Sequence, residues 1–128
     1  MFGELRLPEA PRKDDMAGID HLLLDGETVE REERFVRAHL SGGRRATGKL
    51  YLTDRRMIFR KRLFGGEIVQ DVPYGTVVDV SYKANFMSAA HLTITTADGG
   101  TTRFAVKYDH GPAVLTMIRA HQEALRGP

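Results

Sequence analysis

Apolar and polar residues alternate with a period of two along most of this chain, a pattern that predicts β-strands. Seven short runs of this kind are separated by residues that favour tight turns, such as Asp54-Arg55, Gly65-Gly66 and Asp98-Gly99. The runs cover residues 36–40, 47–53, 57–63, 68–72, 78–82, 92–96 and 104–106. Because each run is short and is followed by a turn, the pattern predicts an antiparallel sheet.

The spacing of apolar residues becomes helical near the end of the chain. Asp109 is placed to cap a helix, Pro112 suits its first turn, and Gly127-Pro128 would end it. The side chains that follow helical spacing are Val114, Met117, Ile118, His121 and Leu125. A single stripe of this kind needs a sheet to bury it. We therefore expect a mainly β fold, a seven-stranded antiparallel barrel or sandwich capped by one C-terminal α-helix.

The N-terminal region and the length of the chain indicate how it is organised. Residues 1–18 contain Pro8, Pro11 and a run of charges with little apolar periodicity, which predicts a flexible tail. Residues 19–24 are predicted to form one or two helical turns at the start of a single domain over residues 19–126. The 128 residues include no cysteine and no apolar run of membrane-spanning length, so we expect a cytoplasmic protein that can also lie peripherally at a membrane.

One stretch of the sequence carries a family pattern. Residues 48–59, Gly-Lys-Leu-Tyr-Leu-Thr-Asp-Arg-Arg-Met-Ile-Phe, follow the form G-x-L-x-L-T-x-x-R, then two apolar residues and Phe. This stretch resembles the signature hairpin of GRAM and bacterial pleckstrin-homology-like (PH-like) domains. Residues 24–27 resemble the family's lead-in to the first strand, and Val72-Pro73-Tyr74 resembles its approach to a later strand. The resemblance spans residues 22–125 and implies a PH-like fold, in a family whose members bind phosphoinositides or proteins.

The sequence contains no complete motif of an enzyme. Residues 43–49 spell the first part of a nucleotide-binding P-loop, but Leu50 follows where Ser or Thr is needed, and the next segment has the pattern of a strand. The histidines have no metal-ligand spacing, and no serine lies in a nucleophile elbow. Asp109-His110 is more typical of a helix cap and its neighbour than of a catalytic dyad. We therefore expect a non-enzymatic module with no catalytic residue, no metal and no cofactor.

Charge is distributed unevenly along the chain, although the formal net charge is only +2. Residues 1–43 carry ten acidic and six basic side chains, whereas residues 44–62 carry eight basic side chains and one acid. A concentrated basic block indicates an anionic partner. The alternative interpretation is a solvated basic surface without a ligand.

Strand pairing places part of this block on one face of the sheet. If Asp54-Arg55 forms the turn, Lys49 lies opposite Arg60, and a five-residue loop before residue 46 puts Arg37 opposite Lys49. Three cations in one row would cost stability unless acids intervene or an anion binds.

The row beside these cations on the predicted sheet is apolar. We predict that the ligand-binding residues are Arg37, Arg44, Arg45, Lys49, Arg60 and Arg62, with Phe35, Tyr51 and Ile58 as an apolar contact strip. Cations beside an apolar strip suit an anionic membrane surface or an anionic protein partner. In a second interpretation, the segment before the first strand covers the strip, with Leu22 or Leu23 packed on Phe35.

The sequence leaves three binding functions open. A protein-interaction or adaptor module, with self-association included, is favoured over peripheral binding of anionic lipid through the basic face. In phosphoinositide-binding PH domains, basic residues of the first two strands and their loop hold the head group, and the resemblance implies that role for Arg44, Arg45 and Lys49. Weak nucleic-acid binding by cations beside Tyr51 and Phe35 is the third hypothesis.

Overall fold

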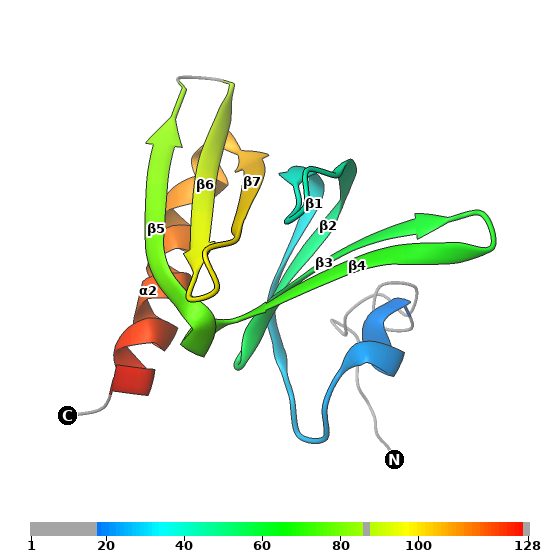
Figure 1. Cartoon of the computed structure of the whole chain (residues 1–128), viewed down its shortest axis with the longest axis horizontal. Coiled ribbons are helices and arrows are strands. Elements are labelled where there is room, and N and C mark those ends of the chain that lie inside the picture. Colours follow the sequence, from blue (N-terminus) through cyan, green and yellow to red (C-terminus); the bar gives the residue numbers. More distant parts are fainter. Residues whose placement is uncertain (1–17, 86–87, 127–128) are drawn as a thin grey trace, which may run out of the picture.

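The computed structural model of the protein describes residues 18–85 and 88–126 (Figure 1), so residues 1–17 of the predicted tail lie outside the described residues. Within these ranges, seven antiparallel strands form one sheet in the order β4-β3-β2-β1-β7-β6-β5. The strands are β1 Val29–His39, β2 Arg45–Thr53, β3 Arg56–Leu63, β4 Gly66–Pro73, β5 Val77–Ala84, β6 Ala89–Thr96 and β7 Thr101–Lys107. The C-terminal helix is α2, Gly111–Arg126, and the short 3-10 turns are η2 Asp20–Leu22, η3 Tyr74–Thr76 and η4 Tyr108–His110. The predicted mainly β fold with one C-terminal helix is confirmed.

The sheet bends so that its two halves enclose the core. Figure 1 shows β5, β6 and β7 beside α2, and β1 to β4 on the other side of the molecule. Phe59 of β3 and Phe104 of β7 stack with their ring centroids 6.1 Å apart, which joins the two halves. Helix α2 buries Val114 and Ile118 completely in the same core. The predicted helical stripe therefore covers the sheet at Val114 and Ile118, whereas its last residue, Leu125, is exposed.

The turns predicted at residues 54–55, 65–66 and 98–99 are found. The β2–β3 hairpin pairs Lys49 with Arg60, as expected from the turn at residues 54–55. Gly65 and Gly99 adopt φ of 82° and 88°, which tight turns of this kind require. Asp109 lies inside η4, which leads directly into α2, so the prediction that it caps the helix is wrong.

The family-like motif in residues 48–59 is used for packing. Leu50 and Leu52 are completely buried in the core. A Cβ at Gly48 would collide with the carbonyl oxygen of Arg60 on the neighbouring strand, so only glycine lets β2 and β3 approach this closely. The first half of the motif therefore fixes the hairpin and its apolar face.

A buried ionic network ties this hairpin to the segment before β1. The Glu27 side chain is excluded from solvent, and its carboxylate accepts hydrogen bonds from Arg56 Nε (2.9 Å) and Nη2 (3.0 Å). The Thr53 hydroxyl (2.6 Å) and the Leu24 backbone N–H (2.8 Å) donate to the same carboxylate. Burial alone would raise the pKa of Glu27, but the hydrogen bonds and the positive charge of Arg56 lower this pKa to about 2. Arg56 also donates to Asp71 of β4 (2.9 Å), so one network joins the lead-in, β3 and β4.

Candidate binding site

Strand β1 meets β2 in a different register from the one predicted. Arg37 lies opposite Thr47, two residues from its predicted partner Lys49. The β1–β2 loop is shorter than expected, because the Leu40 N–H donates to the Arg44 carbonyl oxygen at 2.7 Å. The two glycines of this loop have φ of 91° and 90° and allow so short a turn.

The predicted row of three cations is therefore wrong. Lys49 Nζ lies 3.4 Å from a carboxylate oxygen of Glu32 on β1, and Arg60 Nε donates to Glu67 of β4 at 2.6 Å. The Arg60 contact lowers the pKa of Glu67, although a hydrogen bond from His21 is the larger cause. Acids on both neighbouring strands thus compensate two of the three cations.

Two of the three residues of the predicted apolar strip are buried in the structure. Tyr51 and Ile58 are 2% and 0% exposed, because Ile19 packs on them and forms a second small core on the outer face of the sheet. Partly buried side chains around this core are Leu22, Leu23 and Val29. The second interpretation, a strip covered by the segment before β1, is thus correct for Tyr51 and Ile58, whereas Phe35 is 84% exposed.

Phe35 owes its exposure to a β-bulge. The pairing of β1 with β2 shifts between Glu33 and Val36, and Phe35 within the bulge has φ 55°. A residue with a Cβ in this left-handed region costs about 1 to 2 kcal/mol relative to glycine. The bulge returns Val36 to the core and turns an aromatic ring into solvent.

The exposed Phe35 borders a groove of about 760 Å³ on the outer face of β1, β2 and β3. We call this groove the hairpin groove, and its lining residues are Arg34, Phe35, Thr47, Gly48, Lys49, Tyr51, Arg60, Lys61 and Arg62. Figure 1 shows that the β3–β4 hairpin extends from this region away from the rest of the molecule. Phe64 at the hairpin tip is fully exposed and Leu63 is partly exposed. We call Phe35, Lys61, Arg62, Leu63 and Phe64 the hairpin face.

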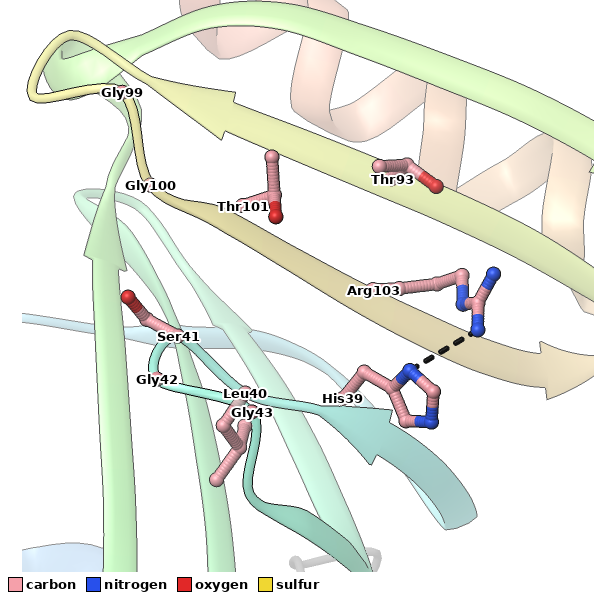
Figure 2. Close-up of a pocket in the computed structure, with 10 residues that line it drawn as sticks. All are labelled: His39, Leu40, Ser41, Gly42, Gly43, Thr93, Gly99, Gly100, Thr101 and Arg103. Carbon is pink, nitrogen blue, oxygen red and sulfur yellow. Dashed lines mark hydrogen bonds between the residues drawn. The ribbon is translucent and has the colours of Figure 1, made fainter.

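A second concentration of cations lies across β2, β1 and β7. Arg45 lies opposite His39, and His39 lies opposite Arg103, so three basic side chains form one row on the outer face. Arg103 Nη2 donates to His39 Nδ1 at 3.0 Å, which requires that His39 be neutral at that nitrogen. Figure 2 shows these two side chains pointing toward each other between their strands. Burial and the charges of Arg45 and Arg103 lower the pKa of His39 below its ordinary value.

The adjacent row extends the cations to β5. Arg37 lies opposite Ala105 of β7, Ala105 lies opposite His91 of β6, and His91 lies opposite Lys83 of β5. Burial and the charges of Arg103, Arg37 and Lys83 lower the pKa of His91. The two rows together form what we call the cationic block: Arg37, His39, Arg45, Lys83, His91 and Arg103.

Among the described residues, no carboxylate lines the groove of about 440 Å³ that runs through the cationic block. Within residues 18–85 and 88–126, Arg37, Arg45 and Lys83 form no ion pair. A neighbouring groove of about 470 Å³ continues from His39 and Arg103 to the glycines of the β1–β2 loop and the β6–β7 turn (Figure 2). Among the residues that the structure describes, the block is therefore a strip of arginine, lysine and histidine side chains with no acid in it or directly opposite it.

The structure divides the predicted basic site between two grooves. Lys49, Arg60 and Arg62 line the hairpin groove, Arg37 and Arg45 line the groove of the cationic block, and Arg44 lines neither. The sequence interpretation missed His39, Lys83, His91 and Arg103. The alternating pattern predicts that these four side chains point outward from their strands. They come together with Arg37 and Arg45 only because β1 pairs with β7, and no local sequence pattern predicts that pairing.

The described ranges assemble no metal centre. No three His, Asp or Glu side chains there come together to hold a metal ion. The P-loop-like residues 43–49 lie in a loop and in β2, and the next element is the strand β3 instead of a helix. Among the described residues, no helix is long and apolar enough to cross a membrane.

Comparisons with known proteins identify the fold independently. The GRAM domain model matches residues 18–126. The Vps36 N-terminal PH domain superimposes with a TM-score of 0.65 at 17% identity, covering 81% of this chain and 86% of that one. A DUF1696 family protein with a pleckstrin-homology domain from Shewanella loihica PV-4 gives a TM-score of 0.65 at 11% identity, covering 88% and 94%. A pleckstrin homology domain from Shewanella amazonensis SB2B gives 0.56 at 16% identity, covering 86% and 96%. No curated protein matches the sequence.

Proposed function

Because the chain belongs to the GRAM domain family and has a PH-like fold, we propose that it is a non-enzymatic binding module that docks peripherally on an anionic membrane surface through the hairpin face. The observation that carries this proposal is the fully exposed Phe64 at the tip of a projecting hairpin, next to Leu63 and two cations. Aromatic side chains favour the membrane–water interface, and lysine and arginine are attracted to acidic head groups.

The hairpin face has the composition of a reversible membrane contact. Full burial of a phenylalanine side chain contributes about 1.5 to 3 kcal/mol, and each cation near an anionic leaflet contributes about 1 kcal/mol. Phe35 and Phe64 with Lys61 and Arg62 would together supply at most about 5 to 8 kcal/mol. This range is typical of peripheral attachment and far below that of a spanning helix.

A protein partner, including a second copy of the chain, is the alternative occupant of the hairpin face. An exchange of hairpins between two copies would place Phe64 of one copy in the hairpin groove of the other. That groove is lined by five cations, of which Arg34, Lys49 and Arg60 pair with Glu32 or Glu67, so the incoming Lys61 and Arg62 would meet the like charges of Lys61 and Arg62 of the other copy. Charge therefore favours an anionic surface over self-association.

Vesicle sedimentation tests the proposal. The full chain is mixed with vesicles of neutral phosphatidylcholine, or of phosphatidylcholine with one-third phosphatidylglycerol, over a series of salt concentrations. We expect salt-sensitive retention on the acidic vesicles only, and a loss of at least tenfold in Phe64→Ser and in Lys61→Glu/Arg62→Glu. Leu125→Ser and Arg119→Glu, at exposed positions of α2, are the controls and should bind like the wild type.

Two results would overturn membrane docking. One is no retention on acidic vesicles at low salt. The other is a dimer in light scattering that Phe64→Ser converts to a monomer, because the hairpin face would then bind a second copy.

A further inference from the structure

The cationic block is a second interaction surface, and we infer that it binds an acidic segment of a partner protein laid across strands β2, β1, β7, β6 and β5. This site is separate from the hairpin face and does not depend on membrane docking. The two grooves share only Thr47 at their border.

Uncompensated charge is what distinguishes this surface from the rest of the sheet. Arg56, Arg60 and Lys49 each have a carboxylate partner within 3.4 Å. In the cationic block, by contrast, Arg45 and Arg103 flank His39 in one cross-strand row, and the described residues provide no acid to separate them. The neutral His39 lies between Arg45 and Arg103, so the two arginines are not directly opposed, but no acid among the described residues offsets their charge and an anionic ligand would do so.

The length of the cationic block indicates an extended ligand. Its side chains come from five neighbouring strands, which at the usual strand spacing span about 19 Å. An extended peptide of six residues covers about 20 Å, whereas a single phosphate or lipid head group would reach only part of the strip. Three arginines along the strip can each hold a carboxylate through two parallel hydrogen bonds.

The shape of the groove favours a peptide over the other polyanions. Ala105 lies between Arg37 and His91 in the second row, and its small side chain leaves a trough between longer ones. Neither Phe nor Tyr is among the described residues that line this groove, so its described lining offers no stacking platform of the kind that holds single-stranded nucleic acid. The exposed rings lie at the hairpin face instead, which leaves the trough without an apolar anchor for a bilayer.

Fluorescence anisotropy with a labelled decaglutamate peptide tests the inference, with decaglutamine as the uncharged probe. We expect decaglutamate to bind the full chain at low salt and decaglutamine not to bind. Arg45→Glu/Arg103→Glu should weaken binding by about a hundredfold, since two charge-assisted contacts become repulsive. Ala105→Leu should weaken it several-fold without any change in charge, because the leucine fills the trough.

Two control variants separate this site from the hairpin face and from a general charge effect. Lys61→Glu/Arg62→Glu changes the net charge by the same amount as the double variant in the block, yet should bind decaglutamate within about twofold of the wild type. Arg119→Glu on α2 should also bind normally. Circular dichroism confirms that Ala105→Leu is folded.

Three results would overturn the inference. The first is no binding of decaglutamate at low salt. The second is equal weakening by the block and hairpin-face variants, which would mean that only net charge matters. The third is that single-stranded oligothymidylate, or acidic vesicles, bind more tightly than decaglutamate, and that this binding is lost in Arg45→Glu/Arg103→Glu but retained in Phe64→Ser. That result would reassign the block to nucleic acid or lipid.

Discussion

Replacement of Glu27 by glutamine tests how much the buried ionic network contributes to stability. In Glu27→Gln the shape of the side chain is kept, but one acceptor oxygen becomes an NH₂ group that faces donors from Arg56 and Thr53. Arg56 would then keep only Asp71 as its anionic partner. The variant therefore removes the charge of Glu27 and reverses one of its hydrogen bonds.

Two routes give the size of the expected loss. A shift of the Glu27 pKa from 4.5 to about 2 corresponds to about 3 kcal/mol of free energy of unfolding. Removal of one partner from a buried, hydrogen-bonded ion pair costs about 3 to 5 kcal/mol in other proteins. We expect Glu27→Gln to lose about 3 kcal/mol at pH 7, or roughly 12 °C in the melting temperature of a domain of this size.

The loss should also depend on pH. Because folding lowers the pKa of Glu27, its contribution is complete above pH 4.5, where the unfolded chain is also ionised, and disappears as pH falls toward 2. Glutamine does not titrate. The stability gap between wild type and Glu27→Gln should therefore be widest at neutral pH and narrow steadily between pH 4.5 and pH 2.

Urea unfolding followed by far-ultraviolet circular dichroism at pH 7, 4 and 3 measures this gap, since the chain has no tryptophan for fluorescence. Glu123→Gln, at an exposed position on α2, is the matched control and should change stability by less than about 0.5 kcal/mol. A loss below 1 kcal/mol in Glu27→Gln at pH 7, or a gap that stays constant with pH, would refute the assignment of this carboxylate as a stabilising anion.

Three further predictions concern single residues. By NMR titration, His39 and His91 should have pKa values below 6.5, because burial and neighbouring arginines disfavour the charged rings. Saturating decaglutamate should raise both pKa values, and a pKa above 6.5 in the free protein would contradict the electrostatics of the block. Gly48→Ala should lower the melting temperature by more than 10 °C, since its Cβ would meet the Arg60 carbonyl oxygen, and an unchanged melting curve would show that β2 and β3 can separate. Phe35→Asn should raise stability by up to about 1 kcal/mol, because asparagine tolerates φ 55°, and should weaken binding to acidic vesicles; weaker vesicle binding with lower stability would point to a packing role for the ring.

The elements predicted correctly are those that local sequence determines. Turn residues and alternation fix the β2–β3 hairpin, so the predicted pairing of Lys49 with Arg60 is found. The predicted register of β1 with β2 was wrong for two reasons. Gly42 and Gly43 allow a turn shorter than the predicted five-residue loop, and the alternation of apolar and polar residues does not reveal the bulge at Phe35.

The candidate site was harder to predict than the fold, for a physical reason. The cations Lys49 and Arg60 are neutralised by Glu32 and Glu67, which come from neighbouring strands. Arg103 reaches the site through the pairing of β7 with β1, strands that are more than sixty residues apart in the chain. A count of charge along the sequence finds the basic segment but cannot find the acids that compensate it.

The placement of the family-like motif has a consequence for how such modules diversify. Leu50, Leu52, Thr53 and Arg56 point into the core or into the Glu27 network, and none of them lines either proposed binding groove. The positions that would choose a ligand are outward-facing and can change without disturbing that framework. Two chains can therefore share these inward-facing letters of the motif and recognise unrelated molecules, so a transfer of function between them should compare the outward rows of the sheet, which include Lys49 of the motif itself.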